Sequence, residues 1–142
     1  MALKKQRLVV SLCAMLISQY AYSETIFYCE TENGKKVEIQ DLGEIIHYRY
    51  GKQLYHPELA LTIPRALAST YQWMGAGRSE YYSVSVPNKS TVYSVYTSRE
   101  RRPDGVLESG IYVESNGQSI ATIRCKNDTL YEQLMGVDLK QD

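Results

Sequence analysis

The stretch YYSVSVPNKSTVYSVYT, from Tyr81 to Thr97, decides the fold class of this chain. In its first half, Tyr82, Val84 and Val86 alternate with serines, so that apolar and polar side chains fall on opposite faces of an extended segment. Pro87-Asn88-Lys89 then turns the chain, and residues 92–97 return it as a second β-rich run. The stretch therefore predicts an antiparallel β-hairpin.

Two Asn-Gly pairs predict two further hairpins. Asn33-Gly34 and Asn116-Gly117 each lie between β-rich runs, and an Asn-Gly pair accepts the positive φ angles of a tight turn. The strands expected outside the Tyr81–Thr97 hairpin cover Thr25–Glu30, Lys36–Gln40, Glu44–Tyr50, Leu59–Ile63, Gly110–Glu114 and Ser119–Cys125. About eight short strands, joined largely as hairpins, favour a mainly β domain that is an antiparallel sandwich or a small, partly closed barrel.

Two segments carry helical signals. Arg65 to Gln72 begins with alanines and a leucine that favour one short helical turn, although its later residues fit a strand equally well. Residues 128–135 are expected to form a short amphipathic helix capped by Asp128. The side chains expected to point inward from this helix are Leu130, Tyr131 and Leu134. The polar tail that follows is expected to fray.

The first 23 residues have the composition of a secretory signal peptide. Basic residues at positions 4, 5 and 7 precede an apolar run over residues 8–17, and Ala21-Tyr22-Ser23 places small residues three and one positions before a cut. The run has about half of the roughly 20 apolar residues that a membrane-spanning helix needs, so cleavage is favoured over a retained anchor. We expect cleavage near Ser23, loss of Cys13 with the signal, and one periplasmic β-rich domain over residues 24–142 without stable membrane insertion.

The charge balance argues against nucleic acid as a partner. The whole chain has 16 basic and 16 acidic residues, and without the three basic residues of the signal it keeps 13 basic residues against the same 16 acidic ones. A protein that follows phosphates along a nucleic acid normally carries a strong basic excess. The expected mature chain is instead mildly acidic.

Cys29 and Cys125 lie near opposite ends of the expected mature chain, and an exported protein meets an oxidising environment. We expect them to form a disulfide, which in the chain-entropy model removes roughly 4.7 kcal/mol of unfolded-state freedom for a loop of about 100 residues. Two unpaired buried thiols are the alternative. The two cysteines, His47 and His56 are not spaced along the sequence as the ligands of a zinc site usually are, so neither a metal nor another cofactor is expected.

No recognisable catalytic motif occurs in the sequence. The serines fall in alternating strand patterns without a Gly-x-Ser-x-Gly elbow. His47 is expected to be a cross-strand residue, and His56 precedes Pro57 and Glu58 in a turn. A spatial pair of carboxylates, as in glycosidases, stays open because such a pair leaves no sequence spacing. We therefore predict that the protein is not an enzyme.

Two groups of residues favour a binding surface. Trp73 lies beside a Gly-rich segment and close to Arg78, Tyr81 and Tyr82, and Trp, Tyr and Arg are the residue types enriched at interface hot spots. The second group is the basic run Arg99, Arg101 and Arg102, which suits bidentate pairing with carboxylates. The alternatives are that Trp73 closes one end of the β core and that the arginines form a solvated loop, or bind an anionic envelope polymer weakly.

Several segments carry a resemblance that covers nearly the whole expected mature chain. They are Phe27-Tyr28-Cys29-Glu30-Thr31 with Asn33-Gly34-Lys35, residues 46–52 (IHYRYGK), Tyr71-Gln72-Trp73, and Asn116-Gly117 leading to residues 121–125 (ATIRC). In these the chain resembles a group of small exported bacterial proteins. It is similar in build to periplasmic lysozyme inhibitors and to immunity proteins that neutralise cell-wall-attacking effectors of type VI secretion.

The resemblance implies a binder that works by occlusion. The favoured hypothesis is a periplasmic immunity protein that binds a cell-wall-targeting toxin, that is, a cognate toxin or cell-wall enzyme. The residues expected to contact this partner are Trp73, Arg78, Tyr81, Arg99, Arg101 and Arg102. The alternatives are an inhibitor of host lysozymes, a non-catalytic envelope-binding protein and an unrecognised enzyme.

Overall fold

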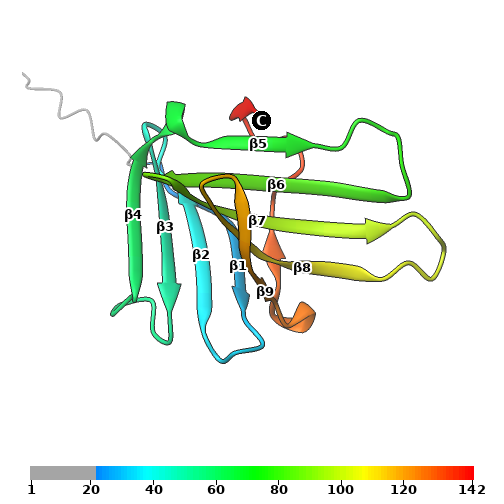
Figure 1. Cartoon of the computed structure of the whole chain (residues 1–142), viewed down its shortest axis with the longest axis horizontal. Coiled ribbons are helices and arrows are strands. Elements are labelled where there is room, and N and C mark those ends of the chain that lie inside the picture. Colours follow the sequence, from blue (N-terminus) through cyan, green and yellow to red (C-terminus); the bar gives the residue numbers. More distant parts are fainter. Residues whose placement is uncertain (1–21) are drawn as a thin grey trace, which may run out of the picture.

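The computed structural model describes residues 22–142, which form two β-sheets (Figure 1). The predicted fold class, a mainly β antiparallel architecture with short helical turns and one disulfide, is confirmed. The predicted signal peptide and Cys13 lie outside the described residues, apart from Tyr22 and Ser23 at its end.

The first sheet has the strand order β10-β1-β2-β3-β4, and every neighbouring pair is antiparallel. Its strands are β1 (Glu24–Glu30), β2 (Lys36–Asp41), β3 (Ile45–Gly51), β4 (Leu59–Pro64) and the two-residue β10 (Tyr131–Glu132). The predicted first hairpin and the two strands after it are therefore present. The tight turn expected at Asn33-Gly34 is wrong: Glu30 pairs with Lys36 across a loop of residues 31–35, in which Gly34 but not Asn33 has positive φ.

The second sheet has the order β11-β5-β6-β7-β8-β9 and is antiparallel except where β11 meets β5. Its strands are β5 (Ser69–Gln72), β6 (Ser79–Asn88), β7 (Thr91–Glu100), β8 (Leu107–Ser115), β9 (Gln118–Arg124) and β11 (Lys140–Gln141). The long strands β6 and β7 are the hairpin predicted from the Tyr81–Thr97 stretch.

Strands of the second sheet run across those of the first, and the chain passes between the sheets at the 3₁₀ turn η1 (Arg65–Leu67) (Figure 1). Crossed packing of this kind needs corners where the chain changes sheet. At another corner, the end of β1 meets the end of β9. There Thr31 bridges Cys125, and the backbone N–H of Lys126 donates to the carbonyl of Glu30 at 2.8 Å. This junction partly closes the sandwich.

Alternation along the strands builds the core between the two sheets. The inward positions of the first sheet include the fully buried Phe27, Ile39 and Ile46, and those of the second sheet include Val84, Val95 and Ile111. Their neighbours in sequence are mostly polar and face outward, so one strand pattern supplies both the core and a polar face.

The Asn116-Gly117 hairpin confirms the turn prediction. Ser115 pairs with Gln118, and both loop residues have positive φ, 52° for Asn116 and 75° for Gly117, as a two-residue turn of the primed type requires.

The turn predicted at Pro87-Asn88-Lys89 is displaced. Pro87 and Asn88 are still paired in β6, and the two-residue loop is Lys89-Ser90, with Lys89 at a φ of 56°. Proline is tolerated there because β5 pairs with β6 only as far as Ser85, so one side of β6 is an open edge at Pro87.

The helical turn expected over Arg65–Gln72 is correct only for η1, because residues 69–72 form strand β5. Thr70 is completely buried, and its hydroxyl donates to the carbonyl of Ser83 in β6 at 2.7 Å. Pairing on both sides, with β6 and β11, outweighs the local helical preference.

The helix predicted over residues 128–135 is wrong. A single 3₁₀ turn, η2 (Asn127–Thr129), is followed by β10, which pairs with Phe27 and Tyr28 of β1. Leu134 is fully buried as expected and Leu130 is half-buried, but Tyr131 is 48% exposed. The segment is extended because the open edge of β1 offers backbone hydrogen-bond partners, whereas a short isolated helix is only marginally stable.

The tail predicted to fray is paired instead. β11 runs parallel to β5, and the backbone N–H of Asp142 donates to the carbonyl of Thr70 at 3.0 Å. Upstream of it, the side chain of Gln72 donates to the carbonyl of Leu134 and accepts from the N–H of Gly136. The tail thus completes the edge of the second sheet.

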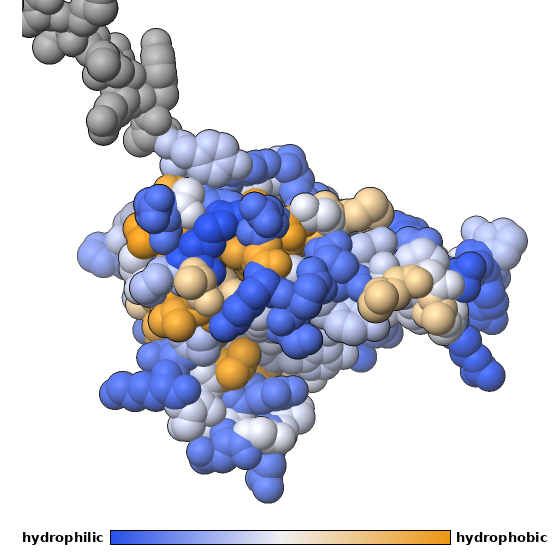
Figure 2. All heavy atoms as spheres, turned by 90° about the horizontal axis from the view of Figure 1, so that it is seen from above, coloured by the Kyte–Doolittle hydropathy of each residue, from blue (hydrophilic) through white to orange (hydrophobic). Residues whose placement is uncertain are grey.

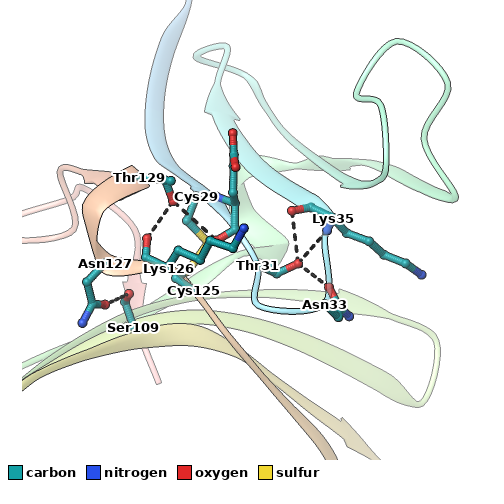
Figure 3. The surroundings of a disulfide bond; sticks show 10 residues. Cys29, Thr31, Asn33, Lys35, Ser109, Cys125, Lys126, Asn127 and Thr129 are labelled. Carbon is teal, nitrogen blue, oxygen red and sulfur yellow. Dashed lines mark hydrogen bonds between the residues drawn. A yellow bond between two sulfur atoms is a disulfide. The ribbon is translucent and has the colours of Figure 1, made fainter.

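The predicted Cys29–Cys125 disulfide is present, with the two Cα atoms 5.7 Å apart (Figure 3). It joins β1 to the residue after β9 and is almost completely buried. Hydrogen bonds surround it: the Thr129 hydroxyl donates to the carbonyl of Lys126 at 2.7 Å, and the Ser109 hydroxyl donates to Asn127 Oδ1 at 2.9 Å. The bond ties the two sheets together where their strands meet.

Candidate binding surface

The β5–β6 loop (residues 73–78) and the β7–β8 loop (residues 101–106) lie at the same end of the second sheet, the right-hand end in Figure 1. Of the six residues predicted to contact a partner, four belong to this end. We call them the loop cluster: Trp73, Arg78, Arg101 and Arg102.

Arg101 holds the two loops together. Its guanidinium carbon lies 4.9 Å from the centre of the Trp73 ring, its Nη1 donates to the carbonyl of Gly77 at 3.2 Å, and its backbone N–H donates to the carbonyl of Arg78 at 2.9 Å. The Trp73 indole N–H donates to the carbonyl of Ala76 at 2.7 Å. The half-exposed Trp73 ring is therefore fixed by polar contacts, and it is not part of the core cluster.

A hollow of about 530 Å³ lies beside these contacts, lined by Arg78, Ser79, Glu100, Arg101 and Arg102. Arg102 forms an ion pair with Glu100. Within residues 22–142, no carboxylate oxygen lies within 4 Å of the charged nitrogens of Arg78 or Arg101. The cluster is therefore a locally basic site on a chain expected to be acidic when mature.

Met74 is a member of this end that the sequence reasoning missed. Its side chain is 91% exposed beside Trp73, and methionine is one of the residue types enriched in protein interfaces. The signal was its adjacency to the tryptophan in a Gly-rich loop.

Arg99 and Tyr81 do not join the loop cluster. Arg99 belongs to β7 on the same face as the inward-facing Thr97, and it lines a small hollow with Glu80 and Glu132. Tyr81 belongs to the opposite, outer face of β6. Alternation along the strand separates residues that are close in sequence, so the predicted contact set divides into three places.

The outer face of the second sheet carries a row of four tyrosines, which we call the tyrosine face: Tyr71, Tyr81, Tyr96 and Tyr112. They come from the neighbouring strands β5, β6, β7 and β8. Consecutive ring centres are 5.5, 5.9 and 4.2 Å apart, and Tyr96 is covered by the rings on either side of it, with 1% of its surface exposed. The excess of tyrosine over phenylalanine in the composition hinted at such a face, but only the strand order aligns these four residues.

A second hollow, of about 400 Å³, lies on the tyrosine face between Tyr71, Tyr81 and Tyr112. Ser83 and Ser85 form part of its lining and are only 3% and 8% exposed, although they point away from the core. The Ser85 and Ser94 hydroxyls are 2.8 Å apart and hydrogen bonded. The hollow is thus lined by both aromatic rings and hydroxyl groups.

Burial raises the pKa of the tyrosines here. It is the main cause for Tyr81, and for Tyr96 burial together with the neighbouring Tyr112 raises the pKa to about 12. Both hydroxyls keep their protons well above neutral pH and stay uncharged donors.

The two histidines lie away from these surfaces. His47 pairs with Gln40 and Thr62 in the first sheet, and burial, followed by the charge of Arg49, lowers its pKa. His56 is exposed in the loop between β3 and β4, with its ring centre 5.4 Å from that of Tyr55. Residues 22–142 contain no group of three or more His, Cys, Asp or Glu side chains arranged to hold a metal ion.

The surface seen from above is mainly hydrophilic, and its hydrophobic side chains are divided into small groups among polar ones (Figure 2). This view thus shows no large continuous apolar patch of the kind that is typical of obligate interfaces (Figure 2).

Among the described residues, no helix is long and apolar enough to cross a membrane. Comparison of the chain with protein-family models, curated proteins and solved structures found no match.

Proposed function

We propose that this protein is a periplasmic immunity protein that binds and neutralises a cell-wall-targeting toxin, with the loop cluster as its main contact. The observation that carries the proposal is the pairing of Trp73 and Arg101, the first residues of two loops at one end of the second sheet. An ordered aromatic ring beside arginines is the side-chain set that dominates the energy of protein interfaces.

The charge of the loop cluster defines the surface that fits it. Arg78 and Arg101 have guanidinium groups free of carboxylate partners in the described part of the chain. Arginine pairs best with carboxylates, through two parallel hydrogen bonds. The expected partner therefore presents acidic side chains next to a pocket or flat area that receives Trp73 and Met74.

Rigidity of the framework supports binding by occlusion. The loops extend from the long strands β6, β7 and β8, and the buried disulfide connects this sheet to the other one. A contact surface that is ordered before binding loses less conformational freedom on association.

The test uses the full chain, expressed in a bacterial host, purified in the oxidised form and immobilised. Secreted and periplasmic fractions of the source organism are passed over it, and each retained cell-wall hydrolase is assayed for peptidoglycan cleavage with and without the protein. The proposal expects one hydrolase to be retained and inhibited. The double variant Trp73→Ala/Arg101→Ala should weaken inhibition by roughly 30-fold or more, as loss of a hot spot does.

The matched control is Lys52→Ala/Tyr55→Ala, which removes a basic and an exposed aromatic side chain from the β3–β4 loop. It should leave inhibition unchanged. Equal inhibition by the folded double variant at the loop cluster would assign binding to another surface. Inhibition of a host lysozyme, with no toxin retained, would instead support the lysozyme-inhibitor alternative.

A further inference from the structure

The hollow on the tyrosine face is a second site, separate from the loop cluster. Its sides are the rings of Tyr71, Tyr81 and Tyr112, and its lining includes the serines Ser83, Ser85 and Ser94. A volume of about 400 Å³ lies within the range of roughly 300–1,000 Å³ that is usual for small-ligand sites.

Hydroxyl groups dominate the polar chemistry of this hollow. Tyrosine and serine hydroxyls each donate one hydrogen bond and accept others, so they match a ligand whose own groups both donate and accept. The raised pKa of Tyr81 keeps its hydroxyl protonated across the physiological range. These features describe a site for an uncharged polyhydroxyl ligand.

The charges at the rim point the same way. In the described part of the chain, the charged residues that line the hollow are Glu114 and Asp142, both acidic. An anionic polymer would be repelled here. Carboxylates accept hydrogen bonds from neutral hydroxyl and amide groups, so an uncharged ligand gains strong acceptors at the edge of the hollow.

We propose that this hollow binds an uncharged saccharide chain, with sugar rings lying against Tyr71 and Tyr112 and sugar hydroxyls bonded to the serines and the two rim carboxylates. A pyranose ring has apolar C–H faces and a polar edge, and the hollow is lined by aromatic rings and by serine hydroxyls that match these two parts. The three rings that line the hollow come from β5, β6 and β8, so a chain laid across these strands meets more than one ring.

A protein partner fits this face less well. The centre of a protein interface is usually an apolar, fully desolvated area. The deepest side chains of this hollow are instead the serines Ser83 and Ser85, and the Ser85 hydroxyl is bonded to that of Ser94, so the hollow is polar where an interface centre would be apolar. The site does not depend on the proposed toxin, since the loop cluster lies at the end of the sheet and not on this face.

The test is a titration of the oxidised, isotope-labelled full chain, followed by backbone amide NMR. The probe is the β-1,4-linked tetramer of N-acetylglucosamine, and a galacturonate tetramer serves as its anionic counterpart. The neutral tetramer should shift amides of β5, β6, β7 and β8 around the hollow, and the anionic one should bind at least about tenfold more weakly.

Tyr71→Ala removes an exposed ring from the hollow and should weaken binding of the neutral tetramer about tenfold or more. Tyr55→Ala removes an exposed ring from the β3–β4 loop and should leave the affinity unchanged. Ser83→Ala tests the hydroxyl floor without removing a ring and should also weaken binding.

Three outcomes would overturn the proposal. They are no amide shifts with the neutral tetramer at millimolar concentration, equal affinity of Tyr71→Ala and the unchanged protein, and tighter binding of the anionic tetramer. If neither saccharide binds while Tyr71→Ala weakens inhibition of a retained toxin, the tyrosine face belongs to the protein interface and the saccharide assignment is wrong.

Discussion

Arg101 lies over the ring of Trp73, with 4.9 Å between the guanidinium carbon and the ring centre, and this contact joins two loops that are separate in sequence. The same side chain also bonds to the carbonyl of Gly77. The two loops adjoin the paired ends of β6 and β7, where Ser79 lies opposite Glu100, and the Arg101 side chain adds a contact between the loops beyond that pairing.

Arg101→Ala should therefore loosen the loops without unfolding the protein. A cation–π contact at an exposed site contributes about 0.5–1 kcal/mol, so the free energy of unfolding should fall by no more than about 1 kcal/mol. Hydrogen exchange should become faster at the amides of residues 74–78, 101–102 and 104–106. Arg102→Ala is the matched control, because Arg102 pairs with Glu100 and not with Trp73. Unchanged exchange in Arg101→Ala would show that the loops are ordered without this contact.

Local patterns in the sequence were sufficient for most of the fold. The alternation in the Tyr81–Thr97 stretch defined β6 and β7, and Asn116-Gly117 placed its hairpin loop to the residue. The two cysteines were predicted to pair from the expected compartment alone, and they do. In each case the deciding interaction is between near neighbours in sequence or between a unique pair of residues.

Two errors share a physical cause. Leu130 and Leu134 are four residues apart, which is helical spacing, but the segment between them forms β10 because β1 has an open edge. Residues 69–72 form β5 because β6 and β11 lie on either side. Both outcomes depend on strand order, which local propensity does not contain.

The candidate sites, like the fold, could be predicted from the sequence only in part. The residue types Trp and Arg pointed to the loop cluster, but whether Arg99 and Tyr81 join it depends on the sheet face that each one occupies. The four tyrosines of the tyrosine face are spread over about 40 residues, so only pairing of four strands in order brings their rings together.

Removal of the disulfide should destabilise the protein strongly. Cys29 and Cys125 are 96 positions apart, and loss of a native disulfide from a small domain typically costs about 2–5 kcal/mol. The double variant Cys29→Ala/Cys125→Ala should unfold at a lower urea concentration, and its free energy of unfolding should be lower by this amount. Reduction of the unchanged protein should give a similar loss. A loss below about 0.5 kcal/mol in both would show that the junction of β1 and β9 is stable on its backbone hydrogen bonds.

The segment between β10 and β11 is predicted to be a structural part of the core. Leu134 is fully buried there, whereas its neighbour Met135 is 69% exposed. Leu134→Ala should lower the free energy of unfolding by about 2–5 kcal/mol because it leaves a cavity. Met135→Ala, the matched control, should change it by no more than about 0.5 kcal/mol. Urea unfolding of the two variants measures the difference, and equal small losses would mean that the segment is not packed as described.

Alkaline pH should destabilise the protein through its buried tyrosines. Burial is the main cause that raises the pKa of Tyr48 and Tyr81, and burial together with the neighbouring Tyr112 raises that of Tyr96 to about 12. A tyrosine in the unfolded chain has a pKa of about 10, so above this pH the unfolded state holds fewer protons than the folded state. Stability is then fully present below about pH 10 and falls as the pH rises toward the folded-state values.

Thermal unfolding followed from neutral pH to above pH 11 should show a midpoint that drops above about pH 10. Tyr48→Phe keeps the ring, which lies 5.4 Å from that of Tyr93, and removes the titrating hydroxyl. Its midpoint should fall less steeply over the same range. The ion pair of Lys35 with Glu58 also titrates at high pH, but it is present in both proteins and cancels in the comparison. Parallel curves for the two proteins would show that ionisation of Tyr48 does not lower the stability of the folded state.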